Sequence, residues 1–302
     1  MTAHPASADD LALPPAFIAC LRGALAAAPH HERLCAFVLS GKLLRARLAT
    51  AATLAVGGTF AVAATAGVAV ELLHSAALLQ DDIIDGADLR RGRTALHVEL
   101  GANVALMLAD YLIFEALSQL LTDGEALPAH AARAAKHLAD CAQTCCRGQL
   151  ADIEPCDPGD ADAEERYRWL AERKTGAQFV AAATTGPILA GCDKPTLAAL
   201  TGYGTAIGAA FQLRDDVLDI CGDGHAMGKP TGNSLARGRL LLPLVFAVHS
   251  AAPFDRTTLW QRIAGEERRL LAIADEHLAC LPDNEGTAIL RAIARAAVER
   301  DV

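Results

Sequence analysis

Aromatic residues and proline are scarce in this chain of 302 residues. Phe, Trp and Tyr make up 4% of the sequence, and there are only 13 prolines. Alanine and leucine are abundant instead, and both favour helices, whereas the β-branched and aromatic residues that build strands are few. We therefore expect an all-α protein. The hydrophobic content of 52% excludes disorder over most of the length.

Runs of basic residues are also missing. The formal net charge is -9, and a nucleic-acid-binding protein usually shows a basic stripe, so we expect no nucleic-acid partner. The nine cysteines include one cluster, Cys141, Cys145 and Cys146, and no second Cys/His pair gives it a zinc-site spacing. We interpret the cysteines as packed, reduced thiols of a cytoplasmic protein.

One uncharged stretch, residues 48–70, is long enough to imitate a membrane span. Gly57-Gly58 interrupts it, so two buried helices joined at a glycine turn explain it better. The first ten residues, MTAHPASADD, lack the basic and apolar regions of a signal peptide. We expect no membrane span.

Apolar residues recur at spacings of three and four along nearly the whole chain, which is the helical pattern. Helix breaks are expected at Gly41, at Gly57-Gly58, and within residues 122–128, 154–162, 191–195 and 222–232. None of these breaks resembles a linker between domains, because both sides stay equally helical and apolar. We expect residues 1–302 to form a single domain.

Two acidic motifs, DDIID and DDVLD, each follow a nearly uncharged helical segment. They contain Asp81, Asp82 and Asp85 in the first motif and Asp215, Asp216 and Asp219 in the second. Positions i and i+4 share a helix face, so each motif places like charges together, which alone is unfavourable. A divalent cation reverses that effect, and magnesium prefers oxygen ligands. The motifs predict a metal site between two facing helices.

Basic residues accompany these motifs. They are Lys42 and Arg45 in GKLLRARL, Arg90, Arg91 and Arg93 in DLRRGR, Lys174 in KTG, and Lys229 in GKPTG. Arginine and lysine both bind phosphate groups. As a set they predict a site for two diphosphates.

The motifs GKLLRARL, LLQDDIIDGADLRRGRTALH, ADYL, GQLAD, KTG, FQLRDDVLD and GKPTG, in this order, resemble the trans-isoprenyl diphosphate synthases, or polyprenyl synthetases. The resemblance implies a single helical bundle of the isoprenoid synthase type with a central active-site cavity. It also implies a magnesium-dependent homodimer that condenses isopentenyl diphosphate with an allylic diphosphate. The uncharged stretch 48–70 offers apolar surface for such a dimer.

The resemblance implies a role for each matching residue. The six aspartates hold magnesium against the allylic diphosphate, and Arg90, Lys174 and Lys229 bind that diphosphate. The residues expected to bind isopentenyl diphosphate are Lys42, Arg45, His74 and Arg91. Thr175 and Gln212 lie near the cation that develops during reaction, and together with Lys174 they form the catalytic group. The sequence departs from the family at Ser234, Arg239 and Leu241, where aspartate, lysine and threonine are usual.

Product length depends, in this family, on the helix before the first motif. One turn back lie Ala76 and Ala77, which are small, and Leu73 follows a turn deeper. Met107 and Phe114 on a facing helix are further candidates for bulk. We expect a product longer than farnesyl diphosphate, with Ala76→Phe shortening it; a farnesyl or geranylgeranyl synthase is the alternative.

Three other hypotheses remain open at this stage. A terpene cyclase also ionises allylic diphosphates, but a second full DDxxD motif and the isopentenyl-site pattern argue against it. Glu71-x-x-His74 matches one element of a di-iron carboxylate protein, which needs two. A non-catalytic subunit that tunes a partner synthase would explain the departures near Ser234.

Overall fold

The computed structural model describes residues 13–154, 156–221, 238–249 and 256–299. Its first half contains helices α1 (Pro15–Leu25), α2 (His31–Leu39), α3 (Leu44–Ala55), α4 (Phe60–Ile84), α5 (Leu96–Leu100), α6 (Ala102–Leu121) and α7 (Pro128–Ile153). Its second half contains α8 (Ala163–Ala171), the π-helix η2 (Glu172–Gly176), α9 (Ala177–Leu189), α10 (Lys194–Cys221), α13 (Leu242–Val248), α14 (Arg256–Leu278) and α15 (Glu285–Val298). Two-residue strands β1 (Leu89–Arg90) and β2 (Arg93–Thr94) form one hairpin.

The expected helix breaks are confirmed wherever the structure describes them. Helices end just before Gly41, Gly57-Gly58 and residues 122–128, 154–162 and 191–195, and a new helix begins after or within each break. The break at 222–232 lies outside the described residues. The uncharged stretch 48–70 is two helices joined at the glycine pair, as predicted, and most of its side chains are buried.

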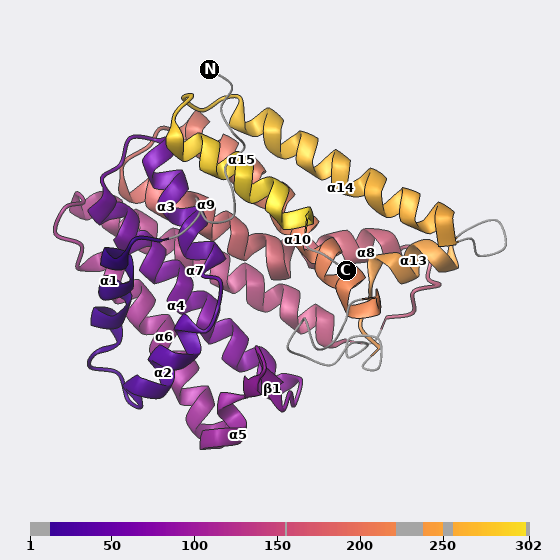
Figure 1. Cartoon of the computed structure of the whole chain (residues 1–302), viewed down its shortest axis with the longest axis horizontal. Helices are drawn as coiled ribbons and strands as arrows, with labels where there is room; N and C mark the ends of the chain where they lie inside the picture. The colour runs from indigo at the N-terminus through magenta and orange to yellow at the C-terminus, as the bar shows by residue number, and fades with distance from the viewer. Residues whose placement is uncertain (1–12, 155, 222–237, 250–255, 300–302) are drawn as a thin grey trace.

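Helix α4 lies at the centre of the larger core. It packs against α3, α6 and α9, and α9 in turn packs against α7 and α10 (Figure 1). Thr59 caps α4, since its hydroxyl accepts a hydrogen bond from the Val62 amide at 3.3 Å. Because α4 is anchored on three sides, the aspartates at its carboxyl end have a fixed position.

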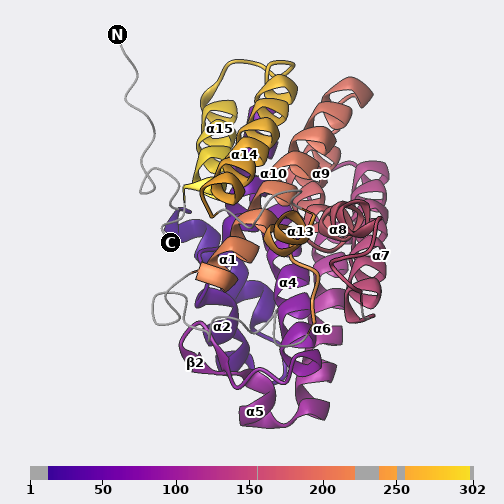
Figure 2. The same cartoon turned by 90° about the vertical axis from the view of Figure 1, so that its right-hand side faces the viewer.

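A smaller core lies under α8, α10, α13 and α14. Its buried side chains include Tyr167, Val217, Val245, Phe246 and Ile263. Helices α8 and α13 lie side by side in this region, beside the second half of α10 (Figure 2). This cluster fixes the end of α10 that carries the second acidic motif.

The hairpin after α4 directs two arginines to different places. Arg91 and Gly92 both have positive φ, 54° and 72°, which is the backbone of a two-residue type I′ turn. Arg90 lies on β1 and reaches back to α4, whereas Arg91, at the turn, reaches α2.

By length and composition alone, α4 and α6 would be able to cross a membrane. The most apolar window of α4 is 78% buried inside the protein, as expected of a core helix. The corresponding window of α6 is only 33% buried, so this helix presents an apolar face outward.

Candidate active site

The first acidic motif lies at the carboxyl end of α4, and the middle aspartate is held by the hairpin. Asp82 is fully buried and accepts hydrogen bonds from Nε of Arg90, at 2.7 Å, and from its Nη2. Nη2 of Arg90 also lies 3.8 Å from Asp81. Asp82 therefore orients Arg90, whereas Asp81 and Asp85 are available to contact other elements.

Asp81 and Asp85 each lie beside cations from later in the chain. Asp81 accepts a hydrogen bond from the Gln149 amide at 3.1 Å, and Lys174 Nζ lies 3.7 Å away. Asp85 accepts a hydrogen bond from Nη2 of Arg239 at 3.0 Å. Asp81 and Asp85, one helical turn apart, therefore pair with different basic residues, Lys174 and Arg239.

The second acidic motif lies near the end of α10. Asp216 is buried and accepts hydrogen bonds from the Gln212 amide at 2.8 Å and from the Leu242 backbone N–H at 3.3 Å. Burial raises the pKa of Asp216 to about 7, although these bonds oppose that rise. Asp215 is half-buried and Asp219 is buried on the same helix.

Two short segments link the acidic motifs, one through Gln212, which itself donates to Asp216, and one directly. In the π-helix η2, Lys174 approaches Asp81, while the hydroxyl of the next residue, Thr175, donates to Gln212 at 2.5 Å. In residues 238–242, Arg239 binds Asp85 of the first motif and the Leu242 amide binds Asp216 of the second. Helices α4 and α10 are therefore joined at their acidic ends by η2 and by residues 238–242.

One stripe of α7 completes this network. Gly148, Gln149 and Asp152 follow Cys145 at helical spacings on the face that meets η2 and α4. Asp152 accepts a hydrogen bond from Lys174 at 2.7 Å and forms an ion pair with Arg239 at 3.2 Å. Burial alone would lower the pKa of Lys174, but the charges of Asp81 and Asp152 outweigh it and raise the pKa.

A second group of expected site residues lies where α3, α4, α9 and α10 meet. Arg45 is buried, and its guanidinium lies 4.8 Å from the centre of the Phe179 ring and 5.4 Å from that of Phe211. His74 is also buried, and its Nδ1 lies 2.8 Å from Oε1 of Gln178. Lys42, two residues before α3 begins, is exposed.

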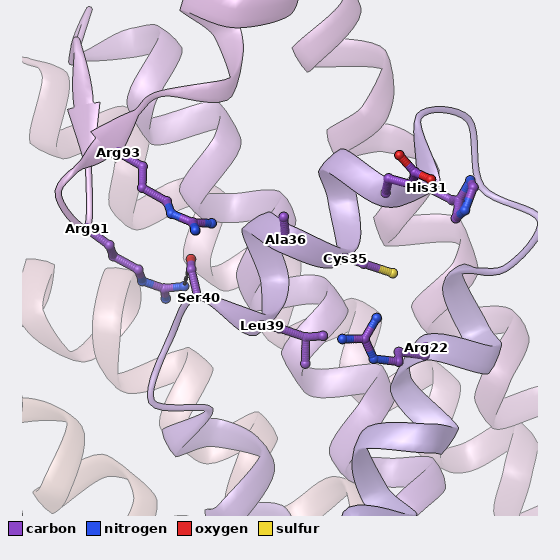
Figure 3. A pocket seen from close by; sticks show the side chains of 9 residues that line it. Arg22, His31, Cys35, Ala36, Leu39, Ser40, Arg91 and Arg93 are labelled. Carbon is purple, nitrogen blue, oxygen red and sulfur yellow. Dashed lines mark hydrogen bonds between the residues drawn. The ribbon is translucent and has the colours of Figure 1, made fainter.

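Arg91 packs against the loop between α2 and α3. Its guanidinium contacts Gly41 and lies 3.2 Å from the Ser40 hydroxyl, next to a cavity of about 750 Å³ (Figure 3). Arg93 enters this cavity from the same hairpin, and Arg22 faces it from α1. A Cβ at position 41 would lie 2.4 Å from Nη1 of Arg91, so a larger residue there would displace this guanidinium.

Sequence reasoning assigned no role to Gln149 and Asp152, although both belong to the quoted motif GQLAD. Gln149 and Asp152 lie four and seven residues after Cys145, so the sequence did place all three on one helix face. Gln178 and Phe179, just after KTG, were also missed. Lys229 and Ser234 lie outside the described residues.

The element Glu71-x-x-His74 does not form one ligand pair. Glu71 is buried and accepts a hydrogen bond from the Ala46 amide at 3.1 Å, whereas His74 contacts Gln178. Within the described residues, no three His, Cys, Asp or Glu side chains converge on one point as a metal cage. The arrangement gives no support to a di-iron site.

The comparisons with known proteins agree with this geometry. Residues 31–276 match the family Polyprenyl synthetase. The chain is 35% identical over 236 residues to a short chain isoprenyl diphosphate synthase of Methanothermobacter thermautotrophicus, covering 78% of this chain and 72% of that one. It is 30% identical to the octaprenyl diphosphate synthase of Escherichia coli over 288 residues, covering 86% of each.

The fold agrees as well. A crystal structure of a polyprenyl synthase from Caulobacter crescentus, complexed with calcium and isoprenyl diphosphate, superposes with a TM-score of 0.83 at 26% identity over 99% of both chains. The chain therefore belongs to the polyprenyl synthetase family and has the all-α isoprenoid synthase fold. It is accordingly a prenyltransferase of isoprenoid biosynthesis, a polyprenyl diphosphate synthase.

Proposed function

We propose that this enzyme condenses isopentenyl diphosphate with an allylic diphosphate in a magnesium-dependent reaction. The observation that supports this most is the joining of the two acidic motifs by η2 and by residues 238–242. That arrangement brings carboxylates, a lysine and an arginine together, and a leaving diphosphate with its metal ions requires such a set. We also propose that residues 1–302 act as one domain and that the protein is cytoplasmic.

The donor set suits magnesium. Magnesium usually keeps several waters and is bound by one or two carboxylates together with substrate phosphates, rather than by a cage made of protein alone. Asp81 and Asp85 at one side, and Asp215 and Asp219 at the other, would hold it in this way. Asp82 and Asp216 would act less directly, since they orient Arg90 and Gln212. The calcium in the Caulobacter complex supports the use of a divalent cation in this family.

The basic side chains of the site form two groups, one for each diphosphate substrate. Arg90, Lys174 and Lys229 would bind the allylic diphosphate, and the position of Arg239 between Asp85 and Asp152 adds it to this group. Lys42, Arg45, His74 and Arg91 would bind isopentenyl diphosphate. Within the described residues, Arg90, Lys174 and Arg239 each contact an aspartate of the first acidic motif. Arg45 and His74 lie instead where α3, α4, α9 and α10 meet, so each substrate would have its own charged region.

The proposed reaction proceeds through an allylic carbocation, which forms when the diphosphate leaves. Bound magnesium would neutralise the leaving diphosphate and so promote ionisation of the allylic C–O bond. The Thr175 hydroxyl and the Gln212 side chain, joined at 2.5 Å beside Asp216, would lie near the cation as it develops. The double bond of isopentenyl diphosphate then attacks this cation, and a proton is lost, with the released pyrophosphate as base. Apolar walls around the growing chain would exclude the water that quenches such a cation.

The direct test uses the pure protein with magnesium and labelled isopentenyl diphosphate. Dimethylallyl, geranyl and farnesyl diphosphates are supplied separately, and the products are sized. A ladder of products that ends at one length supports the proposal. Incorporation of no label with any primer would overturn it, and consumption of an allylic diphosphate without isopentenyl diphosphate would indicate a cyclase.

We propose a product longer than farnesyl diphosphate. The residue to substitute in testing this proposal is Ala77 rather than Ala76. Ala76 is fully buried in the core, where a phenylalanine would overpack its neighbours. Ala77, next on α4, is half-buried. We expect Ala77→Phe to shorten the main product by at least one isoprene unit while the enzyme stays active.

The matched control for this prediction is Ala61→Phe, which makes the same change at an exposed position of α4. It is expected to leave the product unchanged. An unchanged product from Ala77→Phe, measured by chromatography of the dephosphorylated alcohols, would show that this wall does not limit the chain. Met107 and Phe114 are exposed, so they do not narrow the interior.

We propose a homodimer, but through a surface other than the one expected from sequence. The stretch 48–70 is mostly buried within the chain itself, so that expectation was wrong. Helix α6 carries a group of large exposed apolar side chains instead, among which Met107 is 64% exposed and Phe114 is 69% exposed. Met107 and Phe114 line a cavity of about 610 Å³ together with Pro29 and His30, which lie in the loop before α2. Large exposed apolar faces usually mark protein contacts.

We expect the wild-type protein to sediment as a dimer and the double variant Met107→Glu/Phe114→Glu to sediment as a monomer. Two charges placed in an apolar interface leave both copies with unpaired buried carboxylates. Phe60→Glu, which changes an exposed phenylalanine on α4, is the control and should remain dimeric. A monomeric wild type in analytical ultracentrifugation would contradict this prediction.

A further inference from the structure

A chain of three hydrogen bonds connects α4, α9, α7 and η2 beside the proposed isopentenyl diphosphate site. His74 Nδ1 lies 2.8 Å from Gln178 Oε1, and the Gln178 amide nitrogen donates to the sulfur of Cys145 at 3.3 Å. The Cys145 thiol in turn donates to the backbone carbonyl of Lys174 at 3.2 Å. None of these contacts is required for the fold of a single helix, since each joins two different elements.

The direction of the chain is determined by its last member. A backbone carbonyl can only accept, so the thiol proton of Cys145 points to Lys174. The sulfur then accepts from the Gln178 NH2 group, which leaves the Gln178 carbonyl oxygen facing His74. If the Gln178 amide were turned by 180°, its NH2 group would face the imidazole, and the sulfur of Cys145 would receive no hydrogen bond from it. All three bonds therefore form together in one orientation only.

The orientation of Gln178 determines the tautomer of His74. Because Oε1 only accepts, Nδ1 must carry a proton, both in the neutral ring and in the imidazolium. Nε2 is then the ring nitrogen that remains for a ligand. Burial, and next the charge of Arg45, lowers the pKa of His74 well below its usual value, so the free enzyme favours the neutral ring, in which Nε2 carries no proton. A diphosphate only accepts hydrogen bonds, so it would bind at Nε2 with a second proton on the ring, a form that its negative charge favours.

We propose that Gln178 is a positioning residue for isopentenyl diphosphate, which, together with Cys145, fixes the ring of His74 so that Nε2 faces the substrate. This inference rests on the proposed function, since His74 belongs to the group assigned to that substrate. Gln178 itself acts through His74 and takes no part in the ionisation of the allylic substrate. Its loss should therefore affect the two substrates unequally.

Replacing Gln178 with leucine keeps the size of the side chain and removes both of its hydrogen bonds. We expect the KM for isopentenyl diphosphate to rise about tenfold, the effect of losing one well-placed hydrogen bond. The KM for the allylic primer should not change, and kcat should change by less than about threefold. Gln119→Leu makes the same replacement on α6, where the Gln119 amide donates a hydrogen bond to Glu115 at 2.7 Å, and should change neither KM.

Cys145 supplies a second pair of variants. Cys145→Ser keeps a donor and an acceptor at the sulfur position, so the KM for isopentenyl diphosphate should stay near the wild-type value. Cys145→Ala removes both and frees the Gln178 amide to turn, so this KM should rise several-fold. A similar KM in both cysteine variants would contradict the chain of bonds even if Gln178→Leu failed to fold.

A spectroscopic measurement separates this inference from the proposed function. Long-range 1H–15N spectra of protein labelled at histidine, with His74→Gln used for assignment, report which ring nitrogen carries the proton. We expect Nδ1–H in the wild type and a shift toward Nε2–H in Gln178→Leu. If the wild type fails to elongate any primer, the proposed function fails, while these spectra still test the inference. An unchanged tautomer together with an unchanged KM in Gln178→Leu overturns it.

Discussion

Replacing Asp81 or Asp215 with alanine is expected to lower the rate of elongation by about a thousandfold or more. Each carboxylate would hold magnesium against the leaving diphosphate, and such a cation contributes several kcal/mol of stabilisation to the developing charge. Each 1.4 kcal/mol corresponds to about a factor of ten in rate. The loss should appear in single-turnover rates as well as in steady state, and added magnesium should restore activity only in part.

The protein itself should tolerate these changes. Asp81 and Asp215 are only half-buried, and Lys174 keeps its contact with Asp152 at 2.7 Å when Asp81 is removed. Thermal denaturation should therefore show little change. Asp88→Ala, which removes an exposed aspartate just beyond the first motif, is the matched control and should keep full activity. Near-normal turnover in Asp81→Ala or Asp215→Ala would disprove the metal assignment.

The fold was predictable from sequence because the features that determine it are local. Glycine pairs and prolines end helices by their own backbone preferences, so the break at Gly57-Gly58 was read directly. The alternation of apolar residues predicted the helices in the same way. The π-helix η2 was not predicted, since its geometry depends on the close approach of α7 and α10 rather than on the letters ERKTG.

The site was predictable only in part, for a similar reason. The aspartates and arginines were identified because they occur in compact motifs. Arg239 was noticed only as a departure from the family, where lysine is usual. The structure shows that its guanidinium spans Asp85 and Asp152, two positions far from it in sequence. A planar guanidinium presents several donors in a fixed geometry, so one arginine can contact two carboxylates in a single orientation.

The position of the apolar dimer surface could not be read from hydropathy. Stretch 48–70 and helix α6 are both apolar, and composition does not tell which one faces inward. In the folded chain α3 and the first half of α4 are enclosed by α9 and α15, among other elements, whereas α6 has a free side. Only the packing of distant helices distinguishes the two.

Gly148→Ala is expected to disturb the active site strongly, although alanine is normally the better residue in a helix. Gly148 lies in α7 with its backbone against η2. An added Cβ would lie 2.5 Å from the Lys174 nitrogen, 2.8 Å from the Arg173 carbonyl carbon and 2.9 Å from the Lys174 Cα. These are backbone atoms, so no side chain can turn away, and α7 and η2 must separate.

The separation should reduce both stability and activity. Overpacking of this kind costs about 1–3 kcal/mol, which exceeds the gain of up to about 1 kcal/mol from exchanging glycine for alanine in a helix. Lys174 and Thr175 would move away from Asp81 and Gln212, and a displacement of about 1 Å in a catalytic group can lower the rate about a hundredfold. We expect a lower Tm and a rate reduced by roughly that factor.

Gly265→Ala tests this reasoning with the same substitution in a different setting. Gly265 lies inside α14, and nothing lies within 4 Å of a Cβ added there. Alanine should therefore raise the Tm slightly and leave the rate unchanged, since only the helix preference acts. If Gly148→Ala behaved like Gly265→Ala in both Tm and rate, α7 would not determine the position of η2. Opposite shifts in the two variants would show that the close contact at Gly148 holds Lys174 and Thr175 between the two acidic motifs.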